Sequence, residues 1–258
     1  MPASKIELLL VAFGTTREHA HQLYDNIEQT IRQAHPELPM HWAYTSPRIR
    51  AALAKEGLHV DSPQEAISKA SQRGVKALIV QSLLVTPGQE FSRLQDLQAP
   101  AGLDLILAPP LINSRDDMEC IIRAIANDFH PDWPSVVICH GNDNFEHFNE
   151  TNLSLASHIE KSYPTVTVAS VEGLPGPAPL KNVRPIAHQK GGVHFVPMLM
   201  VDGMHVRVDV MGDGPDSWKN QIAAPQTTVA PPLAANPAVV RLILQHLDDT
   251  MPTAGINP

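Results

Sequence analysis

Two apolar runs that each end in glycine constrain the fold of this chain most strongly. Val11-Ala12-Phe13-Gly14 lies near the start of the 258 residues, and Val137-Ile138-Cys139-His140-Gly141 lies just past the middle. A polar segment with helical character follows each glycine directly, which is typical of a strand-to-helix turn in a parallel sheet. The sequence therefore predicts two α/β halves that begin in the same way.

Short apolar runs alternate with amphipathic patterns along both halves, as βαβ units require. Strands are expected at residues 6–13, 40–44, 77–84, 103–107, 135–139, 165–171, 193–201 and 227–229. Helices are expected at residues 16–32, 62–74, 118–125, 144–162, 180–190, 216–223 and 237–247. The expected fold class is α/β, with two parallel-sheet domains and a cleft between them, since such sheets bind ligands beyond the carboxyl ends of their strands.

The segment His130-Pro131-Asp132-Trp133-Pro134 interrupts every periodicity in the chain. Prolines disfavour helix in the residues before them, so this segment is the predicted domain boundary. The expected domains are residues 1–130 and residues 131–258, the second carrying the site described below. The closing helix 237–247 is a candidate to pack back on the N-terminal domain.

Charge and composition exclude several classes of protein. The chain has 19 Lys plus Arg against 27 Asp plus Glu, a formal net charge of −8, which argues against a nucleic-acid partner. No apolar run reaches the length of about 18 residues that a membrane span needs, and no signal-peptide pattern opens the chain. Two cysteines are too few for a disulfide framework, so we expect a cytoplasmic protein.

Thirteen histidines are the unusual part of the composition, and the strand ends select among them. His140, Glu172 and His205 each follow one of three successive predicted strands, so they should meet at one edge of a parallel sheet. Two imidazoles and a carboxylate suit a divalent metal such as cobalt, nickel, zinc or iron. The competing interpretation is three unrelated loop residues. His147 lies two turns past His140 in the same βα unit and is a weaker candidate.

Short motifs follow one another in a fixed order from about Lys5 to Leu247. They are Phe13-Gly14-Thr15-Thr16, Thr45-Ser46-Pro47-Arg48-Ile49-Arg50, Gln81-Ser82-Leu83, Pro87-Gly88-Gln89-Glu90-Phe91, Cys139-His140-Gly141, Val171-Glu172-Gly173-Leu174-Pro175, Pro197-Met198-Leu199-Met200-Val201-Asp202-Gly203-Met204-His205, Gly212-Asp213 and Asp216-Ser217-Trp218-Lys219. In this order the series resembles the anaerobic sirohydrochlorin cobaltochelatases, which are class II chelatases similar to ferrochelatase. Leu84 departs from the family's usual His, and Val208 and Val210 replace its usual Asn and Met.

The resemblance implies a pair of Rossmann-like domains and a lyase that inserts Co(II) into the tetrapyrrole sirohydrochlorin in anaerobic cobalamin biosynthesis. It implies that His140, Glu172 and His205 hold the metal, with cobalt as substrate and no organic cofactor. Imidazole binds metal when neutral and accepts a proton near neutral pH. We therefore expect His140 to take a macrocycle proton, with Glu172 assisting.

Sirohydrochlorin is rich in carboxylates, so its expected contacts are amide-rich or basic turns, together with neighbouring motif residues. These candidates are Phe13, Gly14, Thr15, Ser46, Arg48, Glu90 and Arg207, with Arg17 as a further cation. The competing roles are helix caps for Thr15 and Ser46 and solvated surface cations for the arginines.

Three alternatives stay open at this point. They are a related chelatase for Ni(II) or Fe(II), a carrier that binds tetrapyrrole or metal without turnover, and a metal-dependent hydrolase. The hydrolase would need a general base beside the metal-bound water, for which Asp209 is the nearest candidate. The sequence leaves open the physiological metal, the oligomeric state and any binding of haem.

Overall fold

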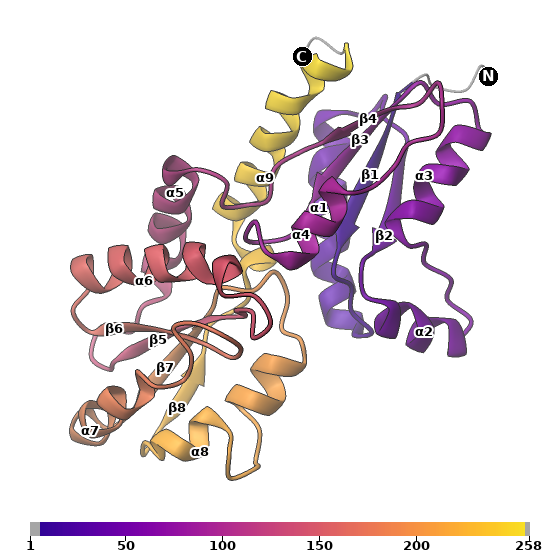
Figure 1. The fold of residues 1–258 in the computed structure, drawn as a ribbon. Coiled ribbons are helices and arrows are strands. Elements are labelled where there is room, and N and C mark those ends of the chain that lie inside the picture. Colours follow the sequence, from indigo (N-terminus) through magenta and orange to yellow (C-terminus); the bar gives the residue numbers. More distant parts are fainter. Residues whose placement is uncertain (1–5, 256–258) are drawn as a thin grey trace. The chain divides into compact units, whose positions relative to one another are not determined.

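The computed structural model describes residues 6–255, which form two compact units (Figure 1). The first unit extends to Asn113 and resumes at Val240, and the second extends from Ser114 to Val239. Each is built on a four-stranded parallel sheet. The outer ends of the two expected domains, residues 1–5 and 256–258, lie outside the described residues.

The first unit contains a sheet in the order β2-β1-β3-β4. Its strands are β1 (Ile6–Ala12), β2 (Met40–Tyr44), β3 (Ala77–Ser82) and β4 (Asp104–Leu107). Its helices are α1 (Glu18–Ala34), α2 (Pro47–Lys55), α3 (Pro63–Gln72) and α4 (Gln89–Gln95), and most of α9 (Pro237–Thr250) also belongs to this unit. In α9, Asp248 lies 2.7 Å from the imidazole of His35, the residue that follows α1.

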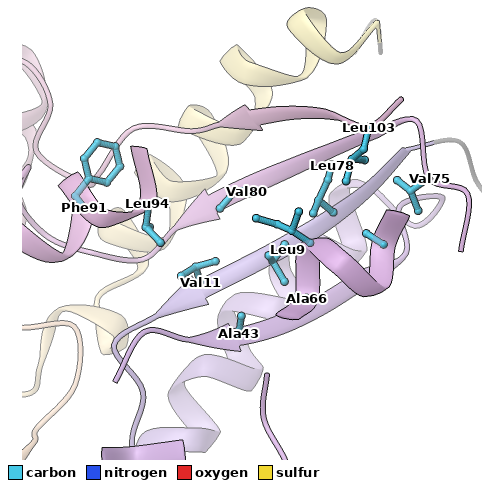
Figure 2. Packing of buried hydrophobic residues seen from close by; sticks show 12 residues of the cluster. Leu9, Val11, Ala43, Ala66, Val75, Leu78, Val80, Phe91, Leu94 and Leu103 are labelled. Atoms are coloured by element: carbon cyan, nitrogen blue, oxygen red, sulfur yellow. The ribbon is translucent and has the colours of Figure 1, made fainter. Parts of the chain in front are cut away.

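Alternate residues of β1 and β3 form one side of the first core (Figure 2). Leu9, Val11, Leu78 and Val80 are at most 1% exposed and lie in one cluster with Ala66 of α3. Neighbouring strand residues point to opposite faces, and burying each Leu or Val contributes about 1.5–3 kcal/mol. The other face of β1 is equally buried, which explains why its sequence is continuously apolar from Leu8 to Ala12.

The second unit repeats the topology in the order β6-β5-β7-β8. Its strands are β5 (Ser135–Cys139), β6 (Val166–Ser170), β7 (Val193–Pro197) and β8 (Thr227–Val229). Its α-helices are α5 (Arg115–Ile125), α6 (Glu150–Ser162), α7 (Leu180–Lys190) and α8 (Trp218–Ile222), and a π-helix spans His205–Val210. In each unit the first strand is therefore flanked by the second and third, so the two halves share one topology.

Two helices of the first unit were not expected from the sequence. The helix α2 begins at Ser46-Pro47, where the Ser46 hydroxyl accepts a hydrogen bond from the Ile49 N–H at 3.4 Å. Ser at the N-cap and Pro in the first turn are a helix start signal. The helix α4 covers seven residues, which is too short for apolar periodicity to stand out.

The predicted strand 193–201 is wrong at its end, because β7 stops at Pro197. Its partner β8 has only three residues and pairs with Val193 to Phe195. Beyond Pro197, the carbonyls of Leu199 and Met200 accept hydrogen bonds from Leu233 and Ala234, in the turn that follows β8. These two carbonyls are thus satisfied without a strand partner.

The compact units divide the chain before α5, earlier than the domain boundary expected at residue 130. Two contacts connect α5 with the second unit. The Asn236 side-chain amide donates to the Ala124 carbonyl at 3.0 Å, and the Ser154 hydroxyl lies 3.8 Å from the Met118 sulfur. Within residues 6–255, no helix is both long and apolar enough to cross a membrane.

Candidate metal centre

The carboxyl ends of β5 and β6 place His140 and Glu172 next to each other. The two strands pair in parallel up to Cys139 and Ser170. The pairing then continues into the loops, because the Glu172 N–H donates to the His140 carbonyl at 2.8 Å. The sheet register itself therefore brings these two residues together.

Gly141 permits the close approach of the two loops. Its φ is +81°, which favours glycine, and a Cβ at this position would lie 1.7 Å from the Glu172 carbonyl oxygen. No side chain fits in that space. The glycine that ends the second apolar run is thus required by the neighbouring strand end.

A buried asparagine holds the loop after β5 in shape, beside a second contact between the two loops. The Asn149 side chain is 1% exposed; its Oδ1 accepts from the Asn142 N–H at 2.8 Å and its Nδ2 donates to the Asn142 carbonyl at 2.9 Å. Gly173 packs on this pair, and its N–H donates to the Asp143 carboxylate at 2.5 Å. The loop after β5 is therefore bound to the residue that follows Glu172.

His205 reaches the same edge by a route that the sequence did not indicate. It begins the π-helix His205–Val210, in which the Met211 N–H bonds to the Val206 carbonyl, five residues back, at 2.9 Å. The His205 and His140 rings are perpendicular, at 89°, with their centroids 4.7 Å apart. His205 thus joins the other two residues from a helix and not from a strand end.

One ligand atom from each of His140, Glu172 and His205 lies within 4.8 Å of the others, the one such cluster among residues 6–255. Two ligands about 2.1 Å from one divalent ion lie at most about 4.2 Å apart, so binding an ion requires only small side-chain adjustments. The three side chains are 48%, 38% and 30% exposed. A site with three protein ligands and this exposure leaves coordination positions open for a substrate.

Hydrogen bonds assign the tautomer of both imidazoles. Nδ1 of His140 lies 2.8 Å from the Gly141 carbonyl, and Nδ1 of His205 lies 2.7 Å from Oδ2 of Asp209. Both partners are acceptors, so in each neutral ring Nδ1 carries the proton and Nε2 offers its lone pair to a metal. Neighbouring Cys139 is no competing ligand, because burial raises the pKa of its thiol to about 12.

Comparison with known proteins identifies the family. The family model described as cobalt chelatase (CbiK) matches residues 7–252, nearly the whole chain. The chain belongs to the cobalt chelatase family. Two relatives of this cobalt chelatase each match 96% of the chain. Sirohydrochlorin cobaltochelatase CbiKC of Nitratidesulfovibrio vulgaris is 29% identical, and the match covers 91% of that protein. Sirohydrochlorin cobaltochelatase of Salmonella typhimurium is 26% identical, and the match covers 97% of that protein.

Solved structures with low sequence identity to this cobalt chelatase have a similar fold. SirB from Bacillus subtilis with Fe3+ has a TM-score of 0.61 at 13% identity, covering 97% of each chain. The structure of CbiX, described as the terminal enzyme for biosynthesis of sirohaem in denitrifying bacteria, has a TM-score of 0.57 at 16% identity, covering 94% of this chain and 98% of that one. The expected pair of parallel-sheet halves is therefore confirmed.

The candidate substrate residues of the first unit lie at its strand ends and on two helices. Phe13 is 48% exposed, and Gly14 has a φ of +104° and packs against the Tyr44 ring. The Thr15 hydroxyl accepts a hydrogen bond from the Arg17 N–H at 3.1 Å. The Ser46 hydroxyl likewise accepts one from the Ile49 N–H in α2. Both hydroxyls thus have a backbone partner, and their contact with substrate stays a prediction.

The remaining candidates carry charge or an imidazole. Arg48 is exposed on α2, and Glu90 forms an ion pair with Arg93 on α4. Arg207 is exposed on the π-helix that begins at His205. His147 lies in a 3₁₀ turn against Phe148, with ring centroids 4.1 Å apart, and is not part of the three-residue cluster.

Sequence reasoning missed two groups that hold the site together. Asp209 entered only as a candidate base, although its spacing of four residues from His205 is the spacing of side chains on one helix face. Asn149 carried no signal, because a single buried asparagine in a loop has no pattern. Its role depends on which backbone groups the fold leaves next to it.

Proposed function

We propose that this chain is a sirohydrochlorin cobaltochelatase, which inserts Co(II) into sirohydrochlorin with release of two protons, in anaerobic cobalamin biosynthesis. The observation that carries the proposal is the cluster of His140, Glu172 and His205 in a chain whose family match spans residues 7–252. The names of the two relatives support sirohydrochlorin as the tetrapyrrole. Co(II) is then a substrate, and we propose no organic cofactor.

Metal insertion needs a site that binds the ion and also releases it. Two neutral imidazoles and a carboxylate bind a divalent ion and offset part of its charge. The open coordination positions allow macrocycle nitrogens to replace protein ligands one at a time. His140 is the most exposed of the three side chains, so we assign it the step in which a macrocycle nitrogen gives up its proton.

A planar tetrapyrrole also needs apolar surface for its faces. Several large apolar side chains that are exposed in the described part of the chain lie on the three segments that hold the cluster. They are Phe145 at 47%, Leu174 at 36%, Met204 at 73% and Val208 at 53%. Apolar groups exposed around a polar centre favour a ligand with an apolar face.

The carboxylates of the substrate need donors or cations. We propose Arg207 on the second unit and, on the first unit, the turn from Phe13 to Thr15 together with Ser46 and Arg48. Glu90, itself a carboxylate paired with Arg93, stays a predicted contact with another part of the substrate. No side chain caps the first turn of α1, whose N–H groups can receive an anion. Both cysteines are free thiols, which supports our placement of the reaction in the cytoplasm.

The structure argues against the metal-dependent hydrolase, because Asp209, its candidate general base, contacts His205. Oδ2 of Asp209 lies 2.7 Å from Nδ1 of His205, so the structure gives this carboxylate a role in holding the imidazole and shows no other candidate base for a metal-bound water within the three-residue cluster. The carrier and the chelatases for other metals are distinguished by experiment.

The test follows the visible absorbance of sirohydrochlorin with the full chain and Co(II), Ni(II), Fe(II) or Zn(II) in separate runs. We expect Co(II) insertion to be catalysed over many turnovers and to exceed the buffer rate most. A larger acceleration with Ni(II) or Fe(II) would assign another metal. Stoichiometric binding of sirohydrochlorin without acceleration would assign a carrier. Glu172→Gln should slow insertion while the unfolding midpoint stays near that of the wild type.

A further inference from the structure

The two histidines of the cluster are held in different ways. Nδ1 of His140 donates to a backbone carbonyl, that of Gly141, which no substitution can remove. Nδ1 of His205 donates instead to a side chain, the carboxylate of Asp209, at 2.7 Å. Asp209 is 41% exposed, so this hydrogen bond is not part of the hydrophobic core of the unit.

The π-helix aligns these two side chains. A helix closed by hydrogen bonds over five residues has more residues per turn than the about 3.6 of an α-helix, so residues four apart lie almost one above the other. His205 and Asp209 occupy such positions on His205–Val210. The carboxylate therefore meets the ring from the adjacent turn and limits its rotation.

We propose that Asp209 is the positioning residue for His205 in metal binding. Its carboxylate holds the proton on Nδ1, so that Nε2 keeps the lone pair, and it fixes the plane of the ring at right angles to that of His140. The inference rests on the proposed function, since it takes His205 as a metal ligand. Asp209 itself contacts neither metal nor substrate and acts through the imidazole alone.

The same chain provides a matched control. Asp248 contacts Nε2 of His35, also at 2.7 Å, and this pair belongs to the first unit. Asp248→Ala removes a carboxylate–imidazole contact of equal length without touching the cluster. An effect on metal binding that appears with Asp209→Ala and not with Asp248→Ala therefore comes from the position of Asp209.

The experiment titrates the full-length chain with Co(II) alone and follows the visible absorption bands of the bound ion. Loss of an outer partner of a metal-binding histidine typically weakens metal affinity by about 10–100-fold, and we expect Asp209→Ala to fall in this range. Asp209→Asn keeps an oxygen that accepts from Nδ1–H, so it should recover most of the affinity and the wild-type band positions. Urea unfolding midpoints of both variants should stay close to the wild-type value, because a single partly exposed contact between polar side chains contributes little to stability.

The outcomes separate this inference from the proposed function. Asp209→Ala with wild-type Co(II) affinity, beside a weakened His205→Ala, would overturn the positioning role and leave the metal site intact. Equal losses in Asp209→Asn and Asp209→Ala, or in Asp248→Ala, would also overturn it. A His205→Ala variant that binds Co(II) as the wild type does would overturn the metal site and the inference together.

Discussion

The backbone N–H of Glu172 donates to the carbonyl of His140 at 2.8 Å, although the two residues lie in loops that follow different strands. This bond extends the pairing of β5 and β6 past their last paired residues, Cys139 and Ser170. The two metal-binding candidates are consequently fixed by the register of a parallel sheet. Anything that separates these strand ends should weaken metal binding without any change in the ligands themselves.

Gly141→Ala tests this dependence. A Cβ at residue 141 would lie 1.7 Å from the Glu172 carbonyl oxygen, so the loops must move apart. Gly57 is the control, because its φ of +80° matches the +81° of Gly141 while nothing lies within 4 Å of its Cβ position. We expect Gly57→Ala to lower the free energy of unfolding by about 1–2 kcal/mol. Gly141→Ala should lower it further and also reduce Co(II) affinity; equal effects of the two substitutions would contradict the account.

Asn149→Ala should loosen the loop that carries His140. The Asn149 side chain is buried and bonds the backbone of Asn142 on both sides, and it also reaches the Glu146 carbonyl at 3.2 Å. Leaving buried backbone groups unpaired costs about 1–3 kcal/mol, which chemical unfolding measures. Asn220→Ala removes one exposed hydrogen bond, from the Asn220 side-chain amide to the Gly214 carbonyl, and should lower the free energy of unfolding far less. A smaller loss for Asn149→Ala than for Asn220→Ala would refute the role of this loop contact.

The sequence predicted most of what depends on local pattern. Apolar runs indicated all eight strands found within residues 6–255, and strand ends indicated His140 and Glu172, because a parallel sheet gathers its carboxyl ends at one edge. The predicted end of β7 was wrong. Its partner β8 has only three residues, and the sequence of β7 contains no sign of that length. The π-helix and the Asp209 contact were missed, because their hydrogen bonds depend on how the chain continues after Pro197.

Met204→Ser tests the apolar surface beside the cluster. Met204 is 73% exposed and precedes His205, so its removal should leave the unfolding midpoint nearly unchanged. If a tetrapyrrole face lies against it, the KM for sirohydrochlorin should rise several-fold while kcat changes less. Leu58→Ser, at an exposed position of the first unit, is the matched control. An unchanged KM in Met204→Ser would remove this side chain from the proposed binding surface.

Stability should fall in mild acid because of His194. Burial, together with the nearby His130, lowers the pKa of His194 below its usual value of 6.5, and Nδ1 of His194 lies 2.7 Å from the Thr228 hydroxyl. The unfolded chain therefore binds this proton at a higher pH than the folded chain does. The contribution of neutral His194 to the free energy of unfolding is fully present above about pH 6.5. It is lost as the pH falls through the lowered pKa of the folded state.

Thermal unfolding of His194→Gln measures this contribution. Between pH 7.5 and pH 5.5, the melting temperature of the variant should decrease by less than that of the wild type. His19→Gln changes an exposed histidine of α1 and should keep the wild-type dependence. Parallel curves for His194→Gln and the wild type would show that other groups cause the acid sensitivity.

The rate of Co(II) insertion into sirohydrochlorin, measured for the wild type, His140→Ala and His205→Ala, tests the central claim most directly. Both side chains are partly exposed, so both variants should fold with unfolding midpoints close to the wild-type value. The account predicts that each loses at least about 100-fold in kcat/KM relative to the wild type, as expected when a group in contact with the reacting atoms is removed. Folded variants that insert Co(II) at the wild-type rate would contradict the assignment of this cluster as the site of metal insertion.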